Sequence, residues 1–152
     1  MIYEIIKGQG YHKKIPLGNG LQAQVERKAG TQLMVQTDYQ GVYGIGEKFD
    51  AVNQKGKVVE TQVIEKFCNQ GNISYCVTPF FVTDTGLGIY IDTKKKTKIS
   101  FQNEILCEIP KEAQIYIFTG TIGDILKDYI HLFQKPQLPP EYAFGIWVSA
   151  NH

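Results

Sequence analysis

The sequence predicts a mainly β protein, an antiparallel β-sandwich with one helix near its C-terminal end. Three observations lead to this prediction. Short apolar segments recur between turn residues over most of the first 118 residues, which is typical of sandwiches. A single stretch, residues 121–134, repeats its apolar residues at helical spacing. The last stretch, residues 135–152, combines three prolines with an unbroken apolar run, and so differs from everything before it.

The expected strands begin with the short apolar segment Tyr3–Ile6, which a polar, glycine-rich link follows. Apolar and polar residues alternate over Leu21–Glu26, which predicts a half-buried strand. A turn at Ala29-Gly30 then leads into a partner strand at Leu33–Val35. The other expected strands are Val58–Ile64, Tyr75–Val82, Leu87–Ile91, Thr97–Phe101, Ile105–Ile109 and Ala113–Phe118, with a tight turn at Asp84–Gly86.

Residues 121–134 are the expected helix. Thr121 can cap its first turn, and Asp124, three residues on, completes a capping box. Lys135-Pro136 ends the helix, because proline cannot continue it. Its apolar stripe consists of Ile122, Ile125, Leu126, Tyr129, Ile130 and Phe133. We therefore assign residues 1–134, including this helix, to one sandwich domain.

The pattern of the final segment, residues 135–152, indicates that it lies in a different environment from the strands of the sandwich. Pro136, Pro139 and Pro140 favour a stiff, extended connector. The run Ala143–Val148 does not alternate, so as a strand it would need cover on both faces, as in a parallel sheet or barrel. Such a strand requires a parallel neighbour. We expect a linker and the first strand of a second domain that this chain does not contain.

Bulk properties exclude several classes of function. The net charge of +1 and the lack of a strongly basic patch argue against a nucleic-acid partner, and Lys94–Lys96 is expected to be a solvated hairpin end. No signal peptide is visible, and no apolar run approaches the ~20 residues of a membrane span. Three cysteines without C-x-x-C spacing predict reduced thiols in a cytoplasmic protein, with no metal site and no cofactor.

Three segments together resemble glycoside hydrolase family 31, the α-glucosidase and α-xylosidase family. Tyr43–Phe49 reads YGIGEKF, similar to the family's Y-G-x-G-E-[KR]-F turn. Pro79–Val82, followed by Gly86–Gly88, is similar to its P-F-[FY] strand and glycine hairpin. The third segment begins with the predicted helix and continues through residues 136–140 to Ala143–Trp147. It looks like the junction between the family's sandwich and its catalytic domain. The resemblance covers about residues 40–151 and implies a galactose-mutarotase-like N-terminal sandwich that leads into the first strand of a (β/α)8 barrel.

The resemblance also implies that the catalytic residues lie outside this chain. The family hydrolyses α-glycosidic bonds with retention through two aspartates on later barrel strands, and retention needs two carboxyl groups about 5–5.5 Å apart. We therefore expect the parent protein to be an enzyme and this chain alone to be inactive. Glu47, beside Gly44 and Gly46, is expected to accept backbone hydrogen bonds. The other local acids are expected to be solvated or structural: Asp50, Glu60, Glu65, Asp84 and Asp92.

In the family, a loop of the sandwich leans over the barrel and supplies an acid three residues after a tryptophan. Counting from Val59–Thr61, Gln62 stands where that tryptophan would be, and Glu65 is the corresponding acid. The alternative is that Glu65 is an exposed charge at a strand end. The further substrate-binding candidates are Phe67, Asn69 and Gln70 on the loop, and Trp147, Asn151 and His152 at the end of the first barrel strand, where barrel active sites assemble. For Trp147, core packing remains an alternative.

The expected partners are an α-linked oligosaccharide or glycoside and the catalytic barrel of the same parent chain. Pairing of the apolar strand with a second copy, giving a homo-oligomer, is a further expectation. Two alternatives stay open: a stand-alone carbohydrate-binding sandwich without catalysis, and a purely structural scaffold domain. The segment Ala143–Ala150 distinguishes the family 31 domain from the stand-alone module, because a self-sufficient module has no use for that strand. A scaffold domain would make no sugar contact even in the full protein.

Overall fold

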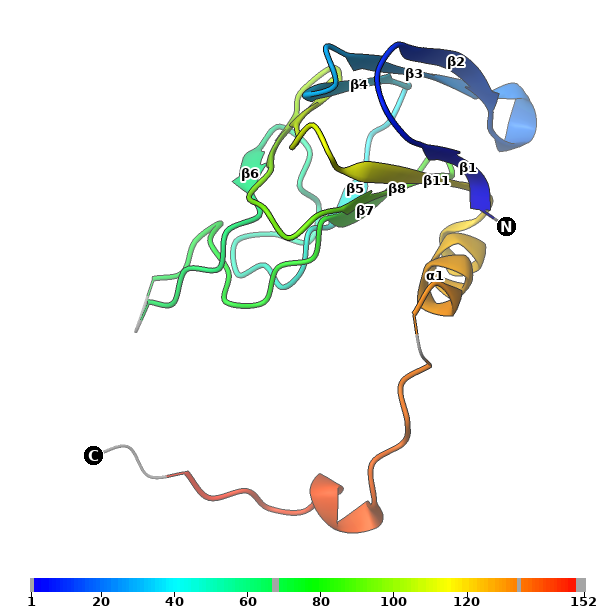
Figure 1. The fold of residues 1–152 in the computed structure, drawn as a ribbon. Coiled ribbons are helices and arrows are strands. Elements are labelled where there is room, and N and C mark those ends of the chain that lie inside the picture. Colours follow the sequence, from blue (N-terminus) through cyan, green and yellow to red (C-terminus); the bar gives the residue numbers. More distant parts are fainter. Residues whose placement is uncertain (1, 67–68, 134, 150–152) are drawn as a thin grey trace.

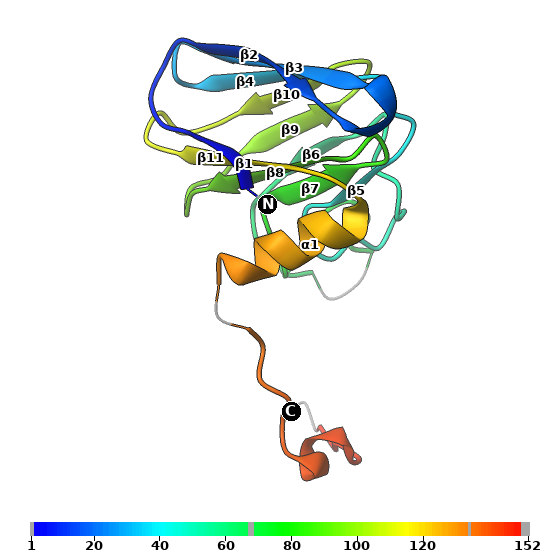
Figure 2. The ribbon, with the colours of Figure 1, turned by 90° about the vertical axis from the view of Figure 1, so that its right-hand side faces the viewer.

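The computed structural model describes residues 2–66, 69–133 and 135–149. Two antiparallel sheets pack face to face, and helix α1 (Ile122–His131) lies against one of them (Figures 1 and 2). The predicted β-sandwich is therefore confirmed. No helix in the described ranges is long and apolar enough to cross a membrane.

The strands form one five-stranded and one six-stranded sheet. The first has the order β1 (Ile2–Ile6), β11 (Gln114–Thr119), β8 (Leu87–Asp92), β7 (Phe80–Thr83) and β5 (Val42–Gly44). The second has the order β2 (Tyr11–Pro16), β3 (Gln22–Lys28), β4 (Gln32–Gln36), β10 (Ile105–Glu108), β9 (Lys98–Phe101) and β6 (Val58–Glu60). Short 3-10 turns occur at η1 (Gly18–Gly20) and η2 (Glu141–Phe144).

The core lies between the two sheets and follows from the alternation of apolar residues. On β3, Ala23 and Val25 point inward and are fully buried, and Val25 lies opposite buried Val35 on β4. On the other sheet, Ile91 lies opposite Ile115. Because β-branched residues pack well on a pleated surface, these pairs favour the strand conformation and build the core at the same time.

One charged side chain, Arg27, belongs to this buried row. It is 1% exposed, and its guanidinium donates only to backbone carbonyls. Nε and Nη2 reach the carbonyl of Gly30 at 3.2 and 2.9 Å, Nη1 reaches Ala113 at 2.8 Å, and Nη2 reaches Lys111 at 2.9 Å. Burial lowers the pKa of the guanidinium, although arginine remains charged in proteins. The side chain thus joins the β3–β4 turn to the segment before β11.

Two strands are absent from the sequence prediction. β2 lies in the segment expected to be a polar link, because it is an edge strand that buries only Ile15 fully. β5 has only three residues, and two of them, Tyr43 and Gly44, belong to the Tyr43–Phe49 motif. Conversely, β6 ends at Glu60 and β7 begins at Phe80, so the described residues between them, 61–66 and 69–79, form a longer loop than predicted.

Helix α1 begins with the predicted capping box. The Asp124 N–H donates to Thr121 Oγ1 at 3.2 Å, and the Thr121 N–H donates to Asp124 Oδ2 at 3.4 Å. Ile125 is buried against Gly88, where a Cβ atom would lie 2.4 Å from Ile125 Cγ2. The Tyr129 ring stacks on Phe80 with centroids 3.9 Å apart. The helix ends at His131 rather than at residue 134, and four of the six residues of its predicted stripe stay 38–48% exposed: Ile122, Leu126, Ile130 and Phe133.

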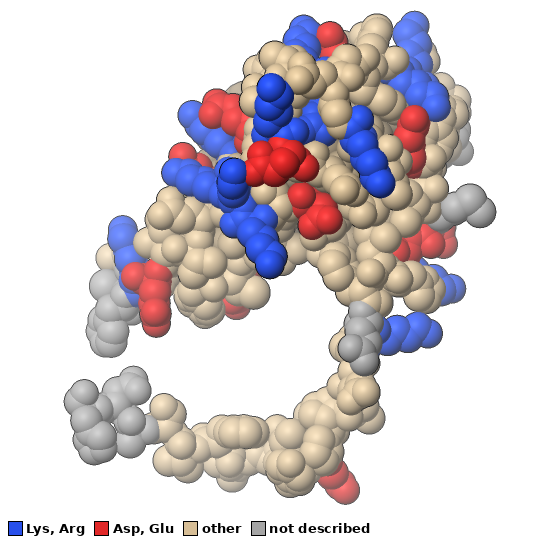
Figure 3. All heavy atoms as spheres, in the orientation of Figure 1, with Lys and Arg blue, Asp and Glu red and all other residues tan. Residues whose placement is uncertain are grey.

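The tail, residues 135–149, extends away from the sandwich (Figures 1 and 2) and carries little charge on its surface (Figure 3). The predicted strand at 143–150 does not form within the described residues. Glu141–Phe144 is a 3-10 turn, residues 145–149 have no regular structure, and Ile146 and Val148 are more than 90% exposed. A strand that needs cover on both faces has no neighbour to pair with here. The division into residues 1–134 and 135–152 stays a prediction.

Deleting residues 141–152 is expected to leave the sandwich folded, because the described part of this segment contains no buried residue. It should also reduce self-association, since exposed apolar residues with unpaired backbone groups favour pairing with another chain. Thermal unfolding and sedimentation of the full and shortened chains check both results. Loss of the cooperative unfolding transition in the shortened chain would show that the tail belongs to the sandwich.

Candidate functional site

The turn after β5 is built on close contact between two backbones. Gly44, Ile45 and Gly46 all have positive φ, at 122°, 63° and 78°. Ile45 is fully buried, and its N–H donates to the Phe80 carbonyl at 2.8 Å. A Cβ atom on Gly44 would lie 2.4 Å from that same carbonyl oxygen, and one on Gly46 would lie 2.2 Å from the Cys76 oxygen. Only glycine fits these two places, which is the physical reason for the Y-G-x-G pattern.

The residues that follow join this turn to the loop before β7. The Glu47 N–H donates to the Cys76 carbonyl at 2.9 Å, and Lys48 Nζ donates to the Asn72 carbonyl at 3.0 Å. The expected role of the Glu47 carboxylate is wrong: it is exposed and accepts no hydrogen bond from a described residue, so the main chain makes the contact instead. Burial lowers the pKa of the Lys48 ammonium group.

Next to these residues, Asp50 is held by Lys57, whose Nζ lies 2.7 Å from Asp50 Oδ2. Burial acts to raise the pKa of the Asp50 carboxyl, but hydrogen bonds from Lys57 and from the Ala51 N–H outweigh it and hold that pKa below its usual value. Asp50 and Lys57 are therefore already paired with each other.

The loop of residues 61–79 carries most of the predicted substrate contacts and projects beyond β6 (Figure 1). The hydroxyl groups of Thr61 and Thr97 lie 2.8 Å apart at its start. Further on, the Ile64 N–H donates to the Ser74 carbonyl at 3.0 Å, and the buried Ser74 hydroxyl donates to the Cys76 carbonyl at 2.8 Å. Hydrogen bonds thus fix both ends of the loop.

Glu65 is exposed and has no ion pair or hydrogen bond among the described residues. Asn69, also exposed, has a positive φ of 56°. The Gln70 side-chain amide donates to the Lys66 carbonyl, whereas its buried Oε1 has no partner in the described part of the chain. Phe67 lies outside the described residues. The fold therefore brings Glu65, Asn69 and Gln70 together on one loop.

The candidates of the tail stand apart from this loop. Trp147 is 77% exposed and donates its indole N–H to the Ala143 carbonyl at 2.9 Å, so it does not pack in the core of this chain. Asn151 and His152 lie outside the described residues.

Of the two acids near the loop, only Glu60 has a partner, because Lys96 Nζ lies 2.6 Å from its Oε2. The six acids considered from the sequence are all exposed, which agrees with solvated or structural roles. A pocket of about 250 Å³ lies beside the loop, and Glu65 does not line it. Its lining residues are Val58, Glu60, Gln62, Ile64, Asn72 and Ile73.

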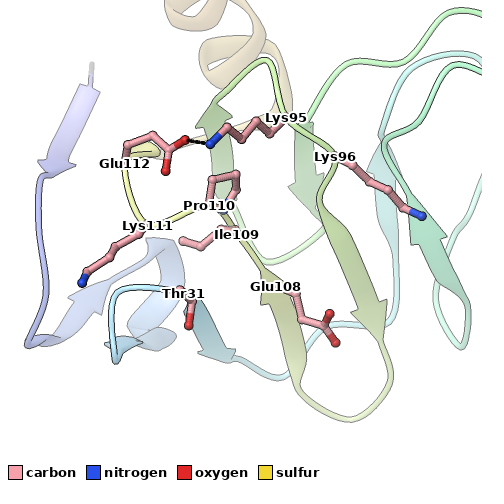
Figure 4. Close-up of a pocket in the computed structure, with 8 residues that line it drawn as sticks. All are labelled: Thr31, Lys95, Lys96, Glu108, Ile109, Pro110, Lys111 and Glu112. Atoms are coloured by element: carbon pink, nitrogen blue, oxygen red, sulfur yellow. Dashed lines mark ion pairs between the residues drawn. The ribbon is translucent and has the colours of Figure 1, made fainter.

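A second, wider hollow of about 620 Å³ lies at the turns beside β10 (Figure 4). Lys95 points to Glu112 and forms an ion pair with it, and Lys96 is the partner of Glu60. Sequence reasoning did not find this hollow, because it unites residues from three distant turns. Its charges are of both signs and largely paired, so it offers no group suited to catalysis. Among the described residues, no cluster of three His, Cys, Asp or Glu side chains could hold a metal ion.

The chain is similar in sequence to parts of several known enzymes. No family model matches the chain. An isomaltosyltransferase from Sporosarcina globispora is 25% identical over 120 residues, which are 72% of this chain and 11% of that protein. An α-xylosidase, XylQ, from Lactiplantibacillus pentosus is also 25% identical, over 72% of this chain and 15% of that protein. The chain thus spans less than a sixth of the length of these two relatives.

Solved structures support the same fold. A cycloalternan-forming enzyme from Listeria monocytogenes, in complex with a pentasaccharide substrate, has a TM-score of 0.69 at 19% identity, over 93% of this chain and 19% of that one. A GH31 dextranase from Flavobacterium johnsoniae has a TM-score of 0.62 at 22% identity, over 89% of this chain and 22% of that one. Sequence relatives and folds together agree with the motifs: this chain is similar to one part of the enzymes of glycoside hydrolase family 31.

Proposed function

We propose that this chain is the N-terminal β-sandwich domain of a retaining α-glycoside hydrolase of the α-glucosidase or α-xylosidase type. In this proposal the sandwich supports a catalytic barrel and lends the loop of residues 61–79 to substrate binding. The observation that carries the proposal is similarity over 72% of this chain to an isomaltosyltransferase and an α-xylosidase, of which it spans only 11% and 15%. Most of each relative therefore corresponds to nothing in this chain.

The proposed partners are an α-linked oligosaccharide or glycoside and the barrel of the same parent polypeptide, rather than nucleic acid or a membrane. We place the protein in cytoplasmic carbohydrate metabolism. The net charge of +1 supports the choice of partners. Among the described cysteines, Cys76 and Cys107 are free thiols, which suits a reducing compartment.

The test of the proposal compares the parent polypeptide with this chain on aryl α-glucosides and α-xylosides. The parent should release the phenol and give a product with retained α configuration, because the resemblance implies two catalytic aspartates beyond this sandwich. This chain alone should release none. Turnover by this chain that disappears after a point mutation within it would overturn the proposal, as would a parent without activity on any α-glycoside.

A second arm of this experiment tests the loop. Glu65→Gln in the parent should lower kcat/KM roughly tenfold to a hundredfold, because a hydrogen bond from a sugar hydroxyl to a charged acceptor contributes ~1.5–3 kcal/mol. The melting temperature should stay nearly unchanged, since an exposed carboxylate without a partner contributes little to stability.

Glu60→Gln is the matched control for Glu65. Its carboxylate precedes the same loop but is already held by Lys96 at 2.6 Å, so its removal should cost much less activity. A larger loss for Glu60→Gln than for Glu65→Gln would move the sugar contact into the 250 Å³ pocket that Glu60 lines. Wild-type kinetics for both variants would leave this sandwich as a scaffold.

A further inference from the structure

Two aromatic rings meet on the surface where the turn after β5 touches the loop before β7. Phe49 is 47% exposed and Tyr75 is 50% exposed. Their ring centroids lie 5.6 Å apart, and the ring planes are inclined at 45°. Among the described residues that precede α1, these are the two exposed aromatic side chains, and they contact each other. Aromatic rings usually bury most of their area, so this exposure is unusual.

The two rings sit on segments that are fixed to each other. The Glu47 N–H bonds to the Cys76 carbonyl at 2.9 Å, two residues before Phe49 and one after Tyr75. Lys48 Nζ bonds to the Asn72 carbonyl at 3.0 Å. Gly46 brings the two backbones into direct contact. The rings are therefore held in place before any ligand arrives, which lowers the entropy that binding must offset.

Phe49 has charged neighbours along the chain. Glu47 and Asp50 flank Phe49 along the chain, and the Glu47 carboxylate is exposed and has no partner among the described residues. A ligand that fits must offer an apolar face to the rings and hydroxyl or amide groups at its edge. A pyranose ring has this character, because its C–H groups gather on one face and its hydroxyl groups lie around the rim.

The area of the pair suits a small ligand. An aromatic side chain has about 150–250 Å² to bury, so two half-exposed rings offer on the order of 200 Å². A stable protein interface needs about 800 Å² from each partner. The two rings by themselves thus offer enough area for one sugar ring, whereas a contact with a second copy of this chain would need further surface around them.

We propose that Phe49 and Tyr75 form a stacking platform for a sugar ring of an α-linked glucan or oligosaccharide. This inference rests on the proposed function for the choice of α-linked sugars. The platform lies wholly within this chain, so it should bind glucan without a catalytic barrel.

The test is affinity electrophoresis of the full 152-residue chain in native gels that contain dextran or soluble starch. Gels without polysaccharide and gels with hydroxyethyl cellulose, a β-linked polymer, are the references. The wild-type chain should be retarded by an α-glucan only. Phe49→Ala and Tyr75→Ala should each weaken the apparent affinity roughly tenfold, whereas Tyr75→Phe should keep it because the ring face remains.

Tyr142→Ala is the matched control, since Tyr142 is an aromatic residue of the tail that is 81% exposed. It should leave the retardation unchanged. Circular dichroism melts of all variants confirm that the sandwich stays folded.

Equal mobility of the wild-type chain with and without α-glucan would overturn the platform, and so would full retardation of the Phe49 and Tyr75 variants. A change of oligomeric state in Phe49→Ala without a change in glucan binding would instead assign the rings to a contact between copies. These outcomes are separate from the proposed function. A parent that hydrolyses α-glycosides while this chain binds no glucan overturns only the platform, and glucan binding with an inactive parent overturns only the hydrolase.

Discussion

Replacing Arg27 with methionine should destabilise the sandwich by about 3–5 kcal/mol, because the buried carbonyl groups of Gly30 and Ala113 lose their donors at ~1–3 kcal/mol each and the partly buried carbonyl of Lys111 loses its donor as well. The side chain is 1% exposed and donates to Gly30, Lys111 and Ala113 at 2.8–3.2 Å. Methionine fills most of the volume but cannot donate. Since small domains are stable by about 5–15 kcal/mol, the expected loss is a large part of the total. The shift of the urea unfolding midpoint measures it.

Lys28→Met is the matched control for this experiment. Lys28 is the next residue on β3, its side chain is half exposed, and its ion pair with Glu26 has an N–O distance of 3.4 Å. Its replacement should change the free energy of unfolding by less than about 1 kcal/mol. Arg27→Lys should recover only part of the stability, because one ammonium group cannot reach carbonyls on two sides. Similar midpoints for Arg27→Met and Lys28→Met would contradict this role of Arg27.

Replacing Gly46 with alanine should destabilise the domain by about 2–4 kcal/mol, the sum of left-handed backbone strain and overpacking. The φ angle is 78°, and a Cβ atom would lie 2.2 Å from the Cys76 oxygen and 2.7 Å from Val77 Cα. These are backbone atoms, so no side-chain rotation relieves the contact. The turn and the loop must move apart, which should also make residues 61–79 more sensitive to limited proteolysis.

Gly56→Ala separates strain from contact. Gly56 has a similar φ of 83°, but nothing lies within 4 Å of its ideal Cβ position. This control should cost only about 1–2 kcal/mol from the backbone conformation and should leave the loop as resistant to protease as in wild type. If both alanine variants lost the same stability, the contact between the turn and the loop would not be what requires glycine at position 46.

Local patterns in the sequence were sufficient for the elements whose signal lies within a few residues. The alternation over Leu21–Glu26 and the turn at Ala29-Gly30 predicted a hairpin that the structure contains as β3 and β4. The Thr121 capping box is formed as expected, since both partners lie within one helical turn. The spaced motifs also led to the correct resemblance, because their glycines serve a backbone contact that few other residues permit.

Elements that depend on distant partners were mispredicted or missed. The edge strand β2 has one fully buried residue, so its pattern is too weak to read without β3 beside it. The run at Ala143–Val148 has the composition of a strand but forms none, because a strand gains its hydrogen bonds only from a neighbour.

By itself the sequence determined the sandwich class, the positions of most strands along the chain, the helix start and the resemblance to family 31. Only the tertiary structure decided which side chains meet. Arg27 reaches carbonyls 84 and 86 residues further along the chain, and Phe49 meets Tyr75 across 26 residues. The tertiary structure also leaves the Glu65 carboxylate without a partner among the described residues, whereas the Glu60 carboxylate forms an ion pair with Lys96. Periodicity encodes which face of a strand is buried, but such long-range contacts depend on how the sheets and loops pack, and no local pattern records that packing.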